Sequence, residues 1–200
     1  QWCEGCRRTL TEIADWPMGS PLTLHTLATL MISRSDNVAT DILLHHVGRQ
    51  RIEGFARSHG GLSGPNAYPL LSTIEATALN NPALGEVRTR WLTGDEAQRR
   101  QLLDEAQDSF TPDHVDFSVF NAGPADIDSI EGFASPRSIA QLLGWFATRG
   151  SDEARAILAV NPGIPSDAAA RWTYAGYKGG SEPGVMAMNL LLRREDGSAY

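Results

Sequence analysis

The stretch that decides the fold, residues 30–41, reads LMISRSDNVATD. Upstream of it, Leu24, Leu27 and Met31 recur at helical spacing, which predicts a helix over about residues 22–32 with Thr23 as its N-cap. The tripeptide Ser35-Asp36-Asn37 interrupts the pattern, and a second helix follows over about 38–47. Ser, Asp and Asn are all favoured N-cap residues, so one interpretation is that the tripeptide only begins the second helix.

Helical patterns continue outward from this stretch, and the period changes only near the end of the chain. Further helices are predicted over about 52–58, 73–79, 82–91, 95–107, 135–149 and 151–160, with loops at 59–72 and 108–134. Strand patterns then occupy 172–177 and 185–192, with turns at 179–184 and 194–197 and a third strand beginning at 198. This order predicts an α+β fold, with a helical lobe over about 20–165 and a sheet hairpin over about 170–200 in one domain, 1–200. Because two or three strands rarely make a stable sheet alone, we expect other segments or another chain to complete it.

Composition narrows the classes of partner. The formal net charge is -7 and the arginines are scattered, which argues against a nucleic-acid partner. No apolar run is long enough for a membrane span. Cys3 and Cys6 could form half of a zinc site or a redox pair, but no second cysteine pair or His-x-x-x-His follows them. We therefore expect no metal and no cofactor, and two ordinary thiols.

A second motif, residues 178–181, reads KGGS and contains the only lysine of the chain, Lys178. Together with Ser35-Asp36-Asn37, it resembles the class A β-lactamase and penicillin-binding-protein superfamily, whose signature set is Ser-x-x-Lys, Ser-Asp-Asn and Lys-Thr-Gly. The Lys-Gly-Gly form, with Leu71-Ser72-Thr73, is similar to a subgroup that includes a protein of clavulanic acid biosynthesis. The resemblance implies a β-lactamase/transpeptidase-like fold, incomplete at both ends of this chain.

The resemblance also implies roles for individual residues. Ser35 would pass a proton to the leaving nitrogen, and Asn37 would bind the substrate amide and orient the lysine of Ser-x-x-Lys. Lys178 would provide positive charge and hydrogen-bond Ser35. The backbone N–H of Ser181 would form half of the oxyanion hole, while Gly179 and Gly180 would let substrate approach the backbone. We therefore expect the Ser35 hydroxyl and the Lys178 ammonium to lie within hydrogen-bonding distance.

Two departures from the superfamily pattern qualify this interpretation. Ser-x-x-Lys is absent, because Ala175 stands three residues before Lys178. We therefore expect the chain to be a fragment that lacks the nucleophile segment and is inactive alone. Gly179 replaces the usual threonine and removes a hydroxyl that would bind substrate carboxylate, which Ser181 could restore.

Glu75 is the candidate that the resemblance offers for the deacylating base. Asn80 follows it by five positions instead of the family's four. The alternative is that Glu75 is ordinary first-turn helix charge.

The leading hypothesis is a serine hydrolase that acts on a small molecule, a β-lactam or a related amide or ester. The alternatives are a non-catalytic binding module on the same fold and a peptidoglycan D-alanyl carboxypeptidase. The resemblance implies a periplasmic or secreted location and no cofactor.

Overall fold

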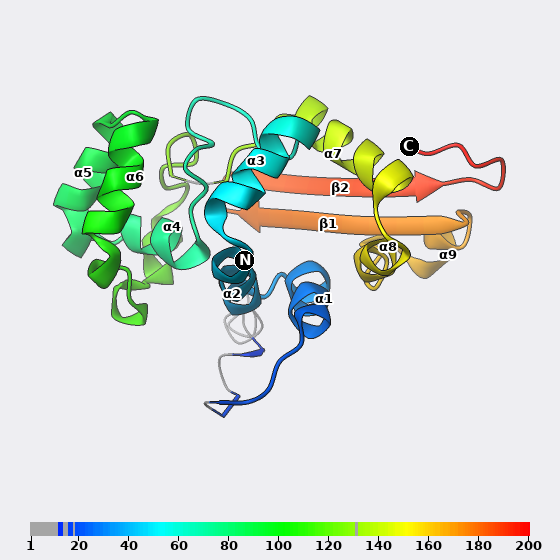
Figure 1. Ribbon diagram of the computed structural model, residues 1–200, viewed down its shortest axis with the longest axis horizontal. Coiled ribbons are helices and arrows are strands. Elements are labelled where there is room, and N and C mark those ends of the chain that lie inside the picture. The colour runs from blue at the N-terminus through cyan, green and yellow to red at the C-terminus, as the bar shows by residue number, and fades with distance from the viewer. Residues whose placement is uncertain (1–11, 14–15, 18, 131) are drawn as a thin grey trace.

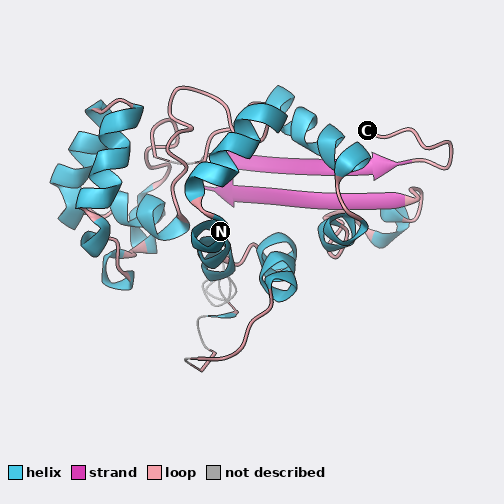
Figure 2. Cartoon of the chain, viewed as in Figure 1, coloured by secondary structure: helices cyan, strands magenta, loops and turns pink. Residues whose placement is uncertain are grey.

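A computed structural model describes residues 12–13, 16–17, 19–130 and 132–200, and Cys3 and Cys6 lie outside these residues. Helices precede a two-stranded antiparallel sheet, which agrees with the predicted α+β order (Figure 1, Figure 2). The α-helices are α1 Leu24–Arg34, α2 Asn37–Val47, α3 Arg49–His59, α4 Thr73–Leu79, α5 Gly85–Thr93, α6 Glu96–Glu105, α7 Pro136–Arg149, α8 Asp152–Leu158 and α9 Ser166–Ala169. The strands are β1 Tyr174–Glu182 and β2 Val185–Arg193. No helix in the described part of the chain is both long and apolar enough to cross a bilayer.

The α1–α2 pair forms one apolar cluster. Thr23 caps α1 as predicted, its side chain accepting a hydrogen bond from the Thr26 backbone. Leu27 and Ala39 are buried with Ile13, and apolar side chains on both helices pack around them. The cluster holds the two helices together on either side of residues 35 and 36.

Helices α4 to α6, together with Ile130, form a second cluster, and these helices lie at one end of the molecule in Figure 1. Its buried members are Leu79, Trp91, Leu102, Leu103 and Ile130. Side chains at 72 and 95 close capping boxes at the starts of α4 and α6. The predicted helix over 82–91 is instead a 3₁₀ turn, Pro82–Leu84, followed by α5.

The hairpin departs from the prediction at its turn. Residues 179–182 belong to β1, where Gly179 pairs with Met188 and Ser181 with Met186, so the predicted turn over 179–184 is wrong. The physical reason is that the apolar strand β2 offers a full ladder of partners, and pairing overrides the weak strand propensity of glycine. The chain reverses only at 183–184, where Gly184 has φ +88°.

Helices cover the hairpin unevenly. Helices α1 and α8 pack against β1, and α7 packs against β2. The apolar side chains at the beginning of β2 stay exposed, Met186 by 79% and Met188 by 56%. The predicted third strand is present only as an isolated bridge between Arg193 and Ala199.

Candidate functional site

Ser35 lies between α1 and α2 in a backbone conformation that non-glycine residues seldom adopt. It is the C-cap of α1, with φ 54° and ψ 39°, and its N–H donates to the Leu30 carbonyl. Among the described non-glycine residues, only Ser35 and Asp126 have positive φ. Such a conformation costs about 1–3 kcal/mol and persists where the surroundings hold it.

The buried carboxylate of Asp36 holds that conformation. Asp36 is fully buried and is the N-cap of α2, accepting a hydrogen bond from Ala39 N at 2.8 Å. Its other oxygen accepts from Glu12 N at 2.5 Å and from Ile13 N at 3.4 Å. The N-cap interpretation of the tripeptide is therefore confirmed for Asp36, and the same carboxylate ties the chain before α1 to the residue that follows Ser35.

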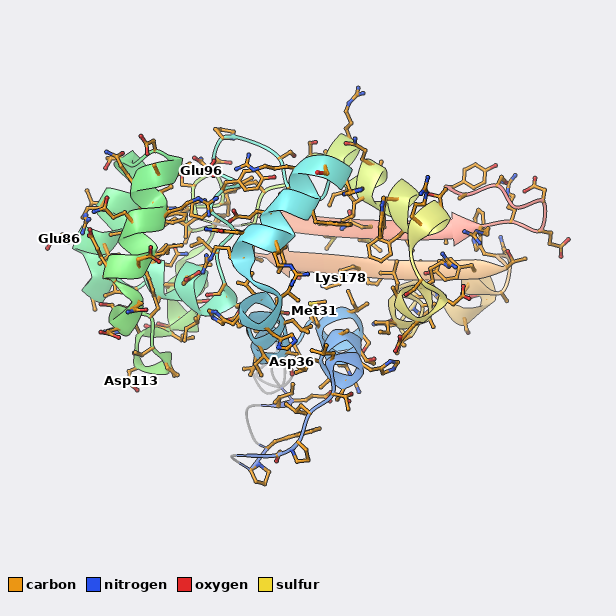
Figure 3. The ribbon with its side chains drawn as sticks, viewed as in Figure 1. Met31, Asp36, Glu86, Glu96, Asp113 and Lys178 are labelled. Atoms are coloured by element: carbon orange, nitrogen blue, oxygen red, sulfur yellow. The ribbon has the colours of Figure 1, made fainter. Side chains whose placement is uncertain are left out.

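Lys178, on β1, contacts Ser35, which lies between α1 and α2. Its Nζ donates to Ser35 Oγ at 2.6 Å, across 143 residues of sequence, so the expected distance is confirmed. Nζ also donates to the Gly179 carbonyl. Figure 3 shows Lys178 and Asp36 in the region where α1, α2 and β1 meet.

The electrostatic setting of Lys178 is unusual. No acidic side chain forms an ion pair with it among the described residues. Burial lowers the pKa of Lys178 below the ordinary lysine value, because the charged form loses hydration. The site thus holds one cation whose contacts are neutral oxygens.

Asn37 and Ser181 bring polar groups to the same two elements. Asn37 is the first residue of α2 and is partly buried, and its amide makes no hydrogen bond to a described residue. Ser181 lies on β1, three residues beyond Lys178, and is exposed. Gly180 between them has open space where a side chain would stand.

Glu75 occupies a structural position instead of joining Ser35 or Lys178. Its carboxylate accepts from Ser72 N at 2.7 Å, which completes the capping box of α4. It also pairs with Arg49 at 2.6 Å. No hydrogen bond or ion pair joins Glu75 to Ser35 or Lys178 in the described part of the chain, so the alternative interpretation as helix-terminus charge accounts for its contacts.

Sequence reasoning missed a clamp and a tyrosine. On α3, Glu53 accepts from the Leu70 N–H at 2.8 Å and Arg49 donates to the Leu70 carbonyl, so residues one helical turn apart hold the loop that precedes α4. Tyr177, next to Lys178, lies against Gly163 and Gly179. The only sequence signal for the tyrosine is its place beside a lysine and two glycines.

One hollow in the described part of the chain lies away from these residues. It has a volume of about 520 Å³ and runs between α3 and the beginning of α7. Its lining includes Arg57, Tyr68 and Arg137 but neither Ser35 nor Lys178. Ser35 and Lys178 therefore do not line this hollow.

One comparison with known proteins bears on the site. A sequence model of the Beta-lactamase enzyme family matches residues 8–107, half of the chain. The matched region includes Ser35-Asp36-Asn37 and Glu75, and it ends before Lys178. No curated protein matches the chain.

Proposed function

Because the chain belongs to the Beta-lactamase enzyme family, we propose that it is the part of a serine hydrolase that handles protons and binds substrate, acting on a β-lactam or a related amide or ester. Membership of this family supports the assignment of the chain as a hydrolase with a small-molecule substrate. The observation that carries the finer proposal is the 2.6 Å contact between Lys178 Nζ and Ser35 Oγ.

Proton transfer is the step to which these two residues are suited. Lys178 donates to the Ser35 oxygen, which leaves the serine's own proton free to pass to the nitrogen of a breaking C–N bond. As the serine gives up that proton, its oxygen takes one from the ammonium. The lowered pKa of Lys178 reduces the cost of this transfer, because burial already disfavours the charged amine.

Substrate binding falls to the neighbouring groups in this proposal. The Asn37 amide, which makes no hydrogen bond to a described residue, binds the substrate amide, and the backbone N–H of Ser181 forms half of an oxyanion hole. Gly180 leaves the β1 backbone open to the substrate. We assign no deacylating role to Glu75, whose carboxylate is already engaged by Arg49 and the α4 capping box.

The proposed hydrolase site also needs a nucleophilic serine. Because Lys178 is the only lysine, no Ser-x-x-Lys occurs in the 200 residues. We propose that the nucleophile belongs to a segment outside them. The second candidate function is a binding module that keeps the site and has no nucleophile. The absence of Ser-x-x-Lys from the 200 residues favours it.

Hydrolysis and covalent labelling test the proposal. The full-length protein should hydrolyse a chromogenic cephalosporin or p-nitrophenyl acetate and gain the mass of benzylpenicillin on one serine. Ser35→Ala should lower the rate by about 10²–10⁴-fold, the usual contribution of general acid–base catalysis. Ser33→Ala is the matched control, since that hydroxyl only donates to the Thr29 carbonyl of its own helix.

Different outcomes separate the candidates. The 200-residue chain by itself should form no adduct, because no serine in it has a lysine or arginine three positions on, the spacing of Ser-x-x-Lys. Stoichiometric acylation of the chain, for instance on Ser35, would contradict the proposal. Reversible binding of benzylpenicillin by the full-length protein without any adduct would favour the binding module.

A further inference from the structure

Tyr177 is held between two glycines that leave room for its ring. A Cβ on Gly163 would lie 2.3 Å from the ring atoms Cγ and Cδ1. A Cβ on Gly179 would lie 1.9 Å from the tyrosine hydroxyl. Both distances are far below van der Waals contact, so the ring rests on one glycine and its hydroxyl stands where residue 179 would otherwise carry a side chain.

The glycine under the ring is tied to the site. Asn161 Nδ2 donates to the Ser33 carbonyl at 3.2 Å, and Asn161 Oδ1 accepts from Gly163 N at 3.2 Å. Ser33 lies two residues before Ser35, near the end of α1. The turn that supports Tyr177 is therefore anchored to the same helix end that presents Ser35.

The polar ends of two side chains, the Lys178 ammonium and the Tyr177 hydroxyl, lie next to Gly179. The Lys178 ammonium donates to the Gly179 carbonyl and to Ser35 Oγ, while the Tyr177 hydroxyl lies over the Gly179 α-carbon. That hydroxyl has no hydrogen-bond partner among the described residues and is not fully buried. A cation and an O–H donor, with no acidic side chain of the described residues paired to the cation, make a site suited to an anion.

We propose that Tyr177 donates its hydroxyl to the carboxylate of the substrate, beside the Lys178 ammonium, and so selects acidic substrates over neutral ones. A carboxylate suits this pair because one oxygen can face the cation while the other accepts from the phenol. The inference rests on the proposed function, since it names a substrate group for the same site. It assigns to Tyr177 the role that residue type alone would give to Ser181, whose exposed side chain lies farther along β1.

The test uses two probes that differ only in charge at one group, phenylacetate and phenylacetamide, with the full-length protein. Binding is followed at constant ionic strength through the amide resonances of Gly179 and Gly180. The wild type should bind the acid more tightly than the amide. Tyr177→Phe should weaken binding of the acid by about tenfold, as expected for the loss of a hydrogen bond to a charged group, and leave the amide unchanged.

One further variant guards against a trivial loss of structure. Tyr174→Phe, on the same strand, removes a hydroxyl that donates to the Arg155 carbonyl at 2.9 Å and should not affect the preference for the acid.

The outcomes distinguish this inference from the proposed function. Equal binding of the two probes by the wild type, an unchanged preference in Tyr177→Phe, or loss of the preference through Ser181→Ala instead would each overturn the inference, whether or not the protein is a hydrolase. A preference that depends on Tyr177 in a protein without hydrolysis or acylation would support the inference and reject the proposed function.

Discussion

Replacing Asp36 by alanine should destabilise the protein far more than removing an ordinary helix cap. The Asp36 carboxylate is fully buried and accepts from three backbone N–H groups, those of Ala39, Glu12 and Ile13. Asp95 offers a matched control, because it also caps a helix but its capping bonds are exposed.

The magnitude follows from the bonds that each change removes. Loss of an N-cap costs about 1 kcal/mol, which is the whole expectation for Asp95→Ala. Asp36→Ala loses the same cap and also leaves the N–H groups of Glu12 and Ile13 without their acceptor. Only the bond from Ile13 is buried, so one group carries the cost of about 1–3 kcal/mol for a buried unpaired donor. We therefore expect a loss of about 3 kcal/mol from the free energy of unfolding.

Urea titration and thermal melting measure the difference. For a chain of this size, about 1 kcal/mol shifts the melting temperature by about 2–4 °C, so we expect about 6–12 °C for Asp36→Ala and about 2–4 °C for Asp95→Ala. Equal shifts for the two variants would refute the reasoning, since they would mean that the bonds to residues 12 and 13 contribute nothing.

Three other predictions concern the burial of Lys178, the Arg49–Glu75 ion pair and the exposed methionines of β2. Burial lowers the pKa of Lys178, so the charged lysine destabilises the folded state. This cost is fully present at pH 7 and vanishes as the pH rises past about 10.4, the pKa of an unperturbed lysine. Lys178→Met should therefore raise the urea midpoint at pH 7, and the gain should shrink in a pH series toward 11. Arg49→Met should cost about 3 kcal/mol by urea titration, because its partner carboxylate is 9% exposed, whereas Arg90→Met, in a surface pair, should cost less than about 1 kcal/mol; equal costs would contradict this. The 200-residue chain should self-associate through the exposed apolar side of its hairpin, and a double Met186→Lys, Met188→Lys variant should elute closer to the monomer volume on size exclusion; a monodisperse unsubstituted chain would show that this surface is harmless.

Local signals located most of the helices but not all of their ends. The predicted range of α4, 73–79, agrees with the structure, because a capping box marks its start in the sequence. Helix α3 begins at Arg49 instead of residue 52, since its first turn is polar and is held by contacts with distant residues such as Leu70. The four-residue helix α9 has no periodic pattern long enough to detect.

The site was predictable where a motif names both partners, and unpredictable where contacts depend on packing. Ser35 and Lys178 come from two separate motifs, and their proximity followed from the resemblance. The contacts of Glu75 with Arg49 depend on how α3 packs near α4, which no local pattern encodes. The position of Tyr177 depends on two glycines, one of them fourteen residues earlier in the chain, so only the structure reveals it.

The packing of Tyr177 limits which mutational steps this lineage can take. A single change of Gly179 to threonine would put a side chain where the phenol hydroxyl stands, so the ring would first have to leave its place against Gly163. Substitutions at positions 163, 177 and 179 are therefore epistatic. A path toward a Lys-Thr-Gly sequence should pass through a smaller residue at 177 before threonine is accepted at 179, and the reverse order should pass through a poorly folded intermediate.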